Sequence, residues 1–298
     1  MKEEEIAIEL EDQRTLVEIP IQTVIGEKKE LRTKVLIECK TEEIKGVIVI
    51  SPGFLQTLED MSVLPFVTSL TSVLLDEGYL VVKYEDLGIR GKNDPGFMYY
   101  SLVQQPATLN TITEVISQQE WSKNRGIFLV GISAGCHTVL NAFPTLSRKP
   151  MTIEPAGVVL ISPVADIVYD IKLYLERHKP LQREQNGGTV RYLYQSHARR
   201  RELEIHGVWA PDTELGANYL LNQLVPIDTP IPTLVIRSYS DNITDSERVG
   251  WILREAKRAG EGGTIDDQIY AVDHNIEGRE EEVQHAIGEI IGFLKAVK

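Results

Sequence analysis

Cysteine is nearly absent from this sequence, in which only Cys39 and Cys136 occur among 298 residues. Two cysteines are too few for a disulfide framework, and their separation does not match the ligand spacing of a zinc site. We therefore expect a protein of a reducing compartment that needs no metal ion.

Long hydrophobic runs are absent as well. No apolar stretch approaches the roughly 18 residues of a membrane span. Residues 1–5 are acidic, whereas a targeting peptide would be basic and then apolar. These features predict a cytoplasmic protein without a segment that spans a membrane.

The chain is poor in positive charge. Its 31 Lys and Arg residues stand against 44 Asp and Glu residues, which gives a formal net charge of −13. Nucleic acids and anionic membrane surfaces would be repelled, because binding to them depends on cationic side chains. The hydrophobic fraction of 42% is typical of a globular protein with a large core. We therefore expect a soluble globular protein without a nucleic-acid partner.

Two hydrophobic patterns follow one another along the chain. Residues 4–38 contain short alternating runs, which indicate antiparallel strands with one solvated face. Continuous apolar runs then alternate with amphipathic segments, which is typical of a parallel sheet covered on both faces. The pattern predicts an α/β fold with a mostly parallel sheet of eight strands and helices on both faces. The expected strands include 6–10, 16–19, 33–37, 46–50, 79–84, 126–130, 157–161, 233–236 and 268–272, and the expected helices lie near 61–77, 106–121 and 134–143 and at the end of the chain.

Residues 165–226 interrupt this alternation. Bare connections of that length are uncommon in compact domains, so the segment is predicted to be an inserted helical cap, or lid. The core is then formed by residues 1–164 and 227–298.

The run Gly131-Ile132-Ser133-Ala134-Gly135 lies between an apolar strand and a helical segment. This is the context of a nucleophile elbow, in which serine occupies a sharp turn and small residues on either side let strand and helix approach. Asp241 and His274 each follow a predicted strand, in the order Ser, Asp, His that such enzymes use. Ligands of open α/β sheets bind beyond the carboxyl ends of the parallel strands, which is where these residues are expected. The three side chains are therefore predicted to meet.

At this point the sequence resembles the α/β-hydrolase family over nearly its whole length apart from the cap. The run Ser51-Pro52-Gly53-Phe54 is similar to the family's His-Gly-Phe-type oxyanion loop, with proline in place of the histidine. Residues 84–91 are similar to the Asp-x-Arg-Gly-x-Gly segment, with departures at Gly88 and Ile89. Residues 241–244 and 273–276 fit the usual surroundings of the acid and the histidine. The resemblance implies a capped serine hydrolase of a lipase-like, peptidase-like or acyl-transferring thioesterase branch.

Each member of the predicted site has a chemical role. A serine hydroxyl is a weak nucleophile, so His274 must accept the proton of Ser133 and return it to the leaving group. Asp241 is expected to hold one tautomer of the imidazole and to stabilise its cation. The backbone N–H groups of Ala134 and of Phe54, or of Leu55 in its place, are expected to face the oxyanion. No metal or organic cofactor is needed for this chemistry.

Several residues could replace members of this set. Asp245 and Asp166 compete with Asp241 for the acid role, since Asp245 lies a helical turn away and Asp166 follows the expected strand at 157–161. Cys136 lies inside the elbow helix and is expected to be an inert, buried thiol. His137 is expected to pack beneath the site.

One basic stretch stands out in the acidic chain. It ends in Arg199, Arg200 and Arg201, a candidate docking site for an anionic group such as a carboxylate or a phosphopantetheine carrier. A solvated face is the alternative. The charged residues between positions 177 and 201 are Arg177, Lys179, Arg183, Glu184, Arg191, Arg199, Arg200 and Arg201.

The function predicted from the sequence is hydrolysis of a carboxylic ester or thioester through an acyl-serine intermediate. A small-molecule or carrier-linked acyl substrate is the expected partner. An aminopeptidase-like enzyme, with Glu202 or Glu204 binding the substrate amine, and an acyltransferase with a different acceptor remain open. A non-catalytic binding protein on the same scaffold is a further alternative. Oligomeric state is not predicted.

Overall fold

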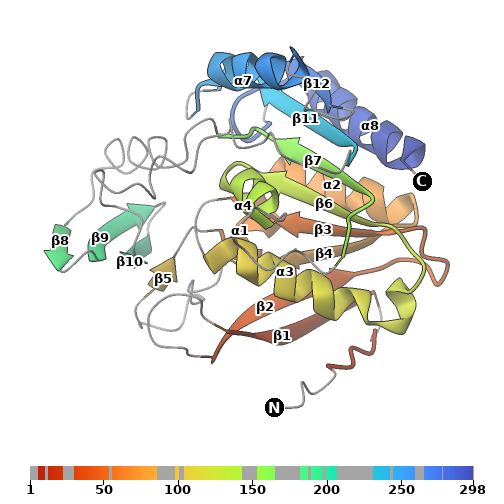
Figure 1. Cartoon of the computed structure of the whole chain (residues 1–298), viewed down its shortest axis with the longest axis horizontal. Helices are drawn as coiled ribbons and strands as arrows, with labels where there is room; N and C mark the ends of the chain where they lie inside the picture. The colour runs from red at the N-terminus through yellow and green to blue at the C-terminus, as the bar shows by residue number, and fades with distance from the viewer. Residues whose placement is uncertain are drawn as a thin grey trace.

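The main body of the molecule is built on one sheet of eight strands in the order β1-β2-β4-β3-β6-β7-β11-β12 (Figure 1). β1 pairs antiparallel with β2, and β2 with β4, whereas the other neighbouring pairs are parallel. The predicted mostly parallel sheet of eight strands is therefore confirmed. The strands are β1 (Arg14–Gln22), β2 (Glu30–Glu38), β3 (Val47–Ser51), β4 (Leu80–Tyr84), β6 (Ile127–Ile132), β7 (Gly157–Ile161), β11 (Thr233–Ser238) and β12 (Ile265–Tyr270).

The computed structural model describes most of the chain. The described residues are 6–10, 13–22, 30–53, 56–85, 98–100, 104–142, 153–164, 182–186, 189–196, 199–206, 231–241, 244–258, 265–276 and 278–297.

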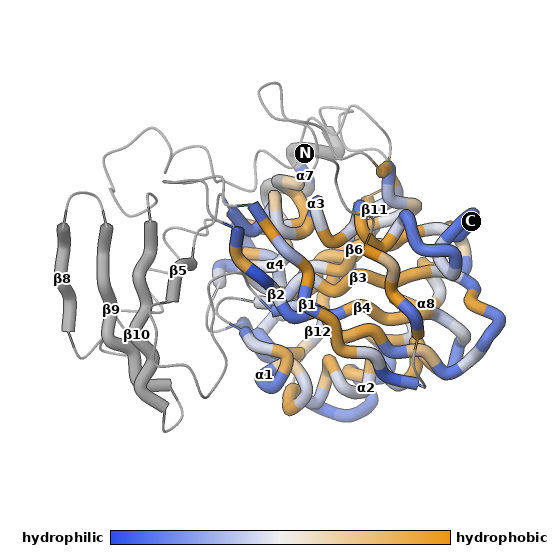
Figure 2. Tube along the Cα trace, turned by 90° about the horizontal axis from the view of Figure 1, so that it is seen from below, coloured by the Kyte–Doolittle hydropathy of each residue, from blue (hydrophilic) through white to orange (hydrophobic). Residues whose placement is uncertain are grey.

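The inner strands β3, β4, β6, β7 and β11 are buried along their whole length, and Figure 2 shows β3, β4, β6 and β11 as predominantly hydrophobic. Successive side chains of a strand lie on opposite faces of the sheet. On β3, Val47 and Val49 therefore join one apolar cluster, and Ile48 and Ile50 join another. The core consists of two apolar layers, one on each side of the sheet.

Helices complete both layers. Leu109 of α3 and Val139 of α4 belong to the first cluster, whereas Leu70 of α2 and Ile290 of α8 belong to the second. The helices are α1 (Leu58–Val63), α2 (Pro65–Asp76), α3 (Gln104–Ser117), α4 (Ala134–Ala142), α7 (Ser246–Arg258) and α8 (Glu280–Ala296), with a 3-10 turn at Glu120–Ser122.

Within the described part of the chain, no helix is both long and apolar enough to cross a membrane.

The strand expected at residues 6–10 is wrong. This segment forms no strand and belongs to neither sheet. Its backbone is bonded by side chains instead: Gln119 accepts from the Ile8 N–H at 2.8 Å and donates to the Ile6 carbonyl at 2.8 Å, and Trp121 donates to the Ile8 carbonyl at 3.2 Å. The alternating apolar residues reflect packing of Ile8 against the core rather than strand pairing.

The expectation of a helical cap is wrong for residues 182–186, 189–196 and 199–206. That part forms three strands, β8 (Gln182–Asn186), β9 (Thr189–Ser196) and β10 (Arg199–His206), which pair antiparallel in order. Gly187 and Gly188 alone separate β8 from β9, and a Gly-Gly pair between strands is a hairpin signal. β9 is also rich in β-branched and aromatic residues, which favour strands.

A short strand that follows β4 in the sequence also belongs to this smaller sheet. β5 (Met98–Tyr100) pairs parallel with β10, which gives the order β5-β10-β9-β8. The small sheet therefore combines two segments that are far apart in sequence. Residues 165–181 and 207–226 lie outside the described residues, so the boundaries of the cap stay a prediction.

Candidate active site

Ser133 lies in the turn that joins β6 to α4. Its φ angle is 53°, in the left-handed region that costs a non-glycine residue about 1–3 kcal/mol. The Ser133 N–H donates to the carbonyl of Ile161 at the end of β7, at 2.8 Å. The surrounding structure thus holds the serine in a strained conformation, as the predicted nucleophile elbow requires.

The two glycines of the elbow are needed for close packing. A Cβ atom on Gly131 would lie 2.6 Å from Cα of Cys136 in α4, and a Cβ on Gly135 would lie 2.3 Å from the Ser51 carbonyl oxygen. Both distances are shorter than any real Cβ contact and involve backbone atoms. Glycine is therefore required where strand and helix cross.

His274 and Asp241 approach the same turn from the segments that follow β12 and β11. His274 follows β12, and its Nε2 lies 2.7 Å from Oγ of Ser133. Asp241 follows β11, and its Oδ2 lies 2.8 Å from Nδ1 of His274. The structure brings together the three side chains that the sequence places 141 positions apart at their extremes.

The hydrogen-bond partners determine the imidazole tautomer. A carboxylate can only accept a hydrogen bond, so Nδ1 of His274 carries the proton that is donated to Asp241. Nε2 is then unprotonated and accepts the hydroxyl proton of Ser133. This is the arrangement in which the imidazole can act as a general base.

The acid and the base are buried, and the nucleophile is not. The side chains of His274 and Asp241 are 6% and 1% exposed, whereas Ser133 is partly exposed. Burial keeps water away from the carboxylate–imidazole contact and strengthens it. The serine hydroxyl can meet a substrate.

Asp241 is held by a second residue, to which sequence reasoning assigned no role. Thr244 donates its backbone N–H to Oδ1 at 2.8 Å and its hydroxyl to Oδ2 at 2.9 Å. An Asp followed by Thr three positions later, just before a helix, is a turn signal that could have indicated this contact.

Asp245, the alternative to Asp241 as the acid, caps a helix instead of bonding His274. Its side chain is exposed and accepts the Arg248 N–H at 2.9 Å in the first turn of α7. This is the geometry of a helix N-cap. Asp166, the other alternative, lies outside the described residues.

The expected oxyanion donors are placed only in part. Ala134 is the first residue of α4, where N–H groups have no partner within the helix and the helix dipole favours negative charge. The Gly53 N–H donates to Oε1 of Gln56 at 2.8 Å, so it is engaged within its own loop. Phe54 and Leu55 lie outside the described residues, and their role stays a prediction.

Cys136 and His137 are both buried, as expected. The Cys136 thiol lies 3.1 Å from the Gly131 carbonyl and 3.3 Å from the Ile161 carbonyl. Burial raises the pKa of the Cys136 thiol well above its usual range, so the reactive thiolate is not formed near neutral pH.

Arg199, Arg200 and Arg201 begin β10, and only their backbone is described. Arg199 and Arg201 are paired with Ser196 and Tyr194 of β9, and Arg200 with Gln195. Because residues alternate between the faces of a strand, Arg199 and Arg201 belong to one face of the small sheet and Arg200 to the other. Substrate binding by these arginines stays a prediction.

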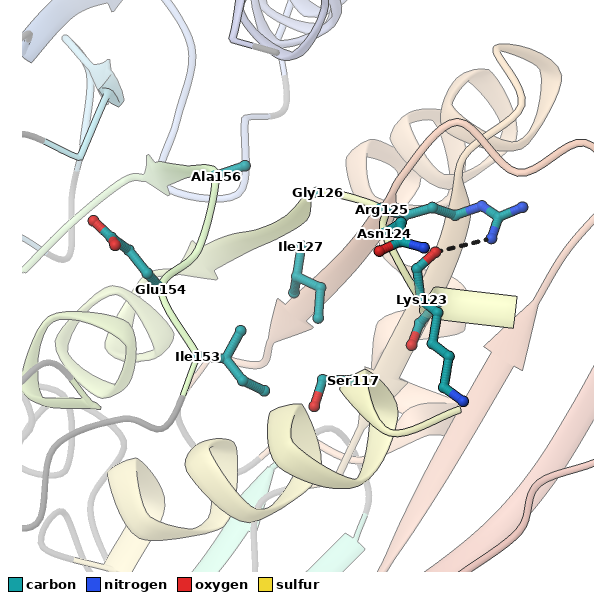
Figure 3. Close-up of a pocket in the computed structure, with 10 residues that line it drawn as sticks. Ser117, Lys123, Asn124, Arg125, Gly126, Ile127, Ile153, Glu154 and Ala156 are labelled. Carbon is teal, nitrogen blue, oxygen red and sulfur yellow. Dashed lines mark hydrogen bonds between the residues drawn. The ribbon is translucent and has the colours of Figure 1, made fainter. Parts of the chain in front are cut away.

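A cavity of about 300 Å³ lies at the opposite edge of the main sheet (Figure 3). Gly126 and Ala156 line it, and they directly precede β6 and β7. Its rim includes Arg125, which donates to the Lys123 carbonyl at 3.5 Å. The length of β6 separates Gly126 from Ser133, about 20 Å of extended chain. This cavity is therefore not part of the Ser133 site.

Solved structures share this architecture at low sequence identity. A hydrolase from Agrobacterium vitis S4 has a TM-score of 0.62 at 13% identity, over 95% of this chain and 100% of that one. An esterase from Pyrococcus furiosus has a TM-score of 0.59 at 12% identity, over 98% of both chains. A thermostable carboxyl esterase from Bacillus coagulans has a TM-score of 0.58 at 11% identity, over 95% of this chain and 98% of that one. No protein-family model and no curated protein matches the sequence.

These findings define the class of the molecule at the level of its fold. The strand order, the helices on both faces and the neighbouring structures show that the chain has the α/β-hydrolase fold. The fold expected from the sequence resemblance is confirmed.

Proposed function

We propose that this protein is a serine hydrolase that cleaves a carboxylic ester or thioester through an acyl-Ser133 intermediate. The observation that carries the proposal is the continuous chain of contacts from Ser133 Oγ to His274 Nε2 and from His274 Nδ1 to Asp241. A fold of this class hosts several functions, so the proposal depends on these side chains and not on the fold alone.

The first half-reaction forms the acyl-enzyme. Oγ of Ser133 attacks the substrate carbonyl carbon while its proton moves to Nε2 of His274, and the carbonyl electron pair moves to the oxygen. When the tetrahedral intermediate collapses, the bond to the leaving group breaks and Nε2 returns the proton to it. Water then attacks the acyl group by the same route, which releases the acid and restores the serine hydroxyl.

Two groups stabilise the charges that develop. Asp241 lies against Nδ1 and stabilises the imidazolium, and its own position is fixed by the two bonds from Thr244. The N–H of Ala134, at the amino end of α4, supports the assignment of an oxyanion donor there. One such donor typically contributes about 3–4 kcal/mol of transition-state stabilisation.

The contacts of the three side chains indicate the nucleophile and the base, but they do not specify which acyl group is transferred or which acceptor receives it. Water is the proposed acceptor, and an alcohol or amine acceptor would make the same intermediate serve acyl transfer. An anionic substrate handle would be bound by the arginines of β10, since guanidinium groups pair well with carboxylate and phosphate. A peptidase activity would instead require Glu202 or Glu204 to bind a substrate amine.

A hydrolysis screen tests the proposal. Purified protein is assayed with p-nitrophenyl esters of increasing chain length, acyl thioesters and aminoacyl amides, with Ser133→Ala as the matched control. Turnover of esters or thioesters that Ser133→Ala abolishes is the expected result. Turnover that survives this substitution, or activity confined to aminoacyl amides, would contradict it.

A further inference from the structure

Two buried serines connect the carboxyl ends of neighbouring strands to the loop that bears His274. Ser162 directly follows β7, Ser238 ends β11, and each is 1% exposed. Oγ of Ser162 lies 3.0 Å from Oγ of Ser238, and Oγ of Ser238 donates to the Asp273 carbonyl at 2.6 Å. Asp273 immediately precedes His274.

The direction of these bonds follows from their partners. A carbonyl oxygen only accepts, so the single hydroxyl proton of Ser238 is used on Asp273. The hydroxyl of Ser162 must then be the donor to Ser238. The two serines form an ordered relay of hydroxyl groups that ends on the histidine loop.

The carbonyl oxygen of Asp273 accepts a second hydrogen bond, which comes from within the histidine loop. The donor is the N–H of Ile276 at 3.1 Å, and the N–H of Asn275 donates to the Asp273 carboxylate at 3.0 Å. Ile276 has a φ angle of 57°, which is costly for a β-branched residue. A tight, strained turn around His274 is thus tied to β11 through Ser238.

The start of the relay is fixed as well. Ser162 has a φ angle of 48°, and its N–H donates to the Ile236 carbonyl of β11 at 2.8 Å. In the same way, the N–H of Ser133 donates to the Ile161 carbonyl of β7. The nucleophile, the two relay serines and the histidine loop therefore lie along one connected carboxyl edge of the sheet.

We propose that Ser238, supported by Ser162, is a positioning residue that holds the backbone beside His274 so that Nε2 stays within reach of Ser133 Oγ. Ser238 bonds the backbone of Asp273 and acts through it on the imidazole. Displacement of a catalytic group by about 1 Å can cost roughly 100-fold in rate. This inference rests on the proposed function and adds to it the device that sets the nucleophile–base distance.

The test compares Ser238→Ala with Thr233→Val, a control on the same strand. Thr233 is also buried and its hydroxyl donates to a backbone carbonyl, that of Ile231 at 3.1 Å, but at the opposite end of β11. Thr233→Val removes one buried hydroxyl hydrogen bond, whereas Ser238→Ala removes the bond to Asp273 and also the acceptor of the Ser162 hydroxyl. Only Ser238→Ala is expected to affect His274.

The measurements are kcat and KM for a p-nitrophenyl ester, the rate of fluorophosphonate labelling of Ser133, and Tm. Ser238→Ala should lower kcat and the labelling rate by about 10- to 100-fold with KM within about twofold, whereas Thr233→Val should change only Tm. A kcat for Ser238→Ala equal to that of Thr233→Val would overturn the inference. So would a loss that appears wholly in KM.

Two further measurements keep the result decisive. If Ser238→Ala does not fold, Ser162→Gly removes the donor to Ser238 while tolerating the positive φ angle, and an unchanged kcat there would overturn the relay. If the wild-type protein shows neither turnover nor labelling, the proposed function fails. In that case the downfield proton NMR resonance of the His274 Nδ1–H, sharp in wild type and broadened in Ser238→Ala, tests the positioning role by itself, and an unchanged resonance overturns it.

Discussion

Thr244 holds Asp241 by two hydrogen bonds, one from its backbone N–H at 2.8 Å and one from its hydroxyl at 2.9 Å. The hydroxyl shares Oδ2 of the carboxylate with Nδ1 of His274. Any rotation of the carboxylate away from the imidazole would therefore break a bond to Thr244. The orientation of the base therefore depends also on the residue that holds its acid partner in place.

Replacement of the Thr244 hydroxyl should weaken catalysis without abolishing it. In Thr244→Val one donor to the carboxylate is lost but the backbone bond remains. Loss of a whole hydrogen bond to a charged group, about 1.5–3 kcal/mol, would correspond to roughly 10- to 150-fold in rate. Because the backbone bond retains part of the orientation, we expect kcat to fall about 3- to 10-fold. Thr244→Ser keeps the hydroxyl and should retain most of the activity. Equal kcat values for Thr244→Val and wild type, measured with one ester substrate, would show that the hydroxyl does not orient Asp241.

The two neighbouring carboxylates should behave in opposite ways. Asp241→Asn removes the charge beside Nδ1 and favours the wrong tautomer, so kcat should fall by about 10⁴-fold. Asp245→Ala should leave kcat within about twofold and lower the free energy of unfolding by about 1 kcal/mol, because an N-cap of α7 is lost. Steady-state kinetics and urea unfolding of both variants separate the roles, and a large kcat loss in Asp245→Ala would reverse the assignment.

The glycines of the elbow and of the last helix should respond differently to alanine. In Gly135→Ala the new Cβ would lie 2.3 Å from the Ser51 carbonyl oxygen, so the backbone must move, and we expect a loss of about 2 kcal/mol in stability together with a loss of activity. Gly288, within α8, has open space around it. Gly288→Ala should raise stability by up to about 1 kcal/mol at unchanged activity. Urea unfolding in which Gly135→Ala is as stable as wild type would contradict the close packing of the elbow.

The register of the small sheet distinguishes among the three arginines. Arg199 and Arg201 alternate with Arg200 along β10, so they belong to one face of the small sheet and Arg200 to the other. We expect Arg199→Ala and Arg201→Ala each to raise KM by about tenfold for an ester with a carboxylate on its acyl chain, at low salt. KM for a neutral ester should not change. Arg200→Ala is the matched control, and equal KM values for all three variants would dispose of the anionic handle.

Much of the fold follows from local pattern. Val47 to Ile50 form a continuous apolar run that can be buried only between two layers, and the carboxyl ends of such parallel strands meet at one edge. Because Ser133, Asp241 and His274 each follow one of these strands, their approach to one another is predictable before any coordinate is known.

Other features depended on information that short patterns do not contain. The backbone groups of residues 6–10 are bonded by the side chains of Gln119 and Trp121, more than a hundred positions away, and not by a neighbouring strand. The break in strand–helix alternation at residues 165–226 indicates an insertion, but it does not specify that part of this insertion forms the strands β8, β9 and β10. Ser162 and Ser238 carry a weaker signal, that of polar residues at the ends of otherwise buried strands.

The measurement that tests the account most directly is covalent labelling of the folded protein with a fluorophosphonate, followed by mass spectrometry of the modified peptide. We predict one label per chain, on Ser133, and none on Ser133→Ala or His274→Ala variants of wild-type stability. A folded wild-type protein that stays unlabelled, or that is labelled at another residue, would contradict the assignment of Ser133 as the nucleophile.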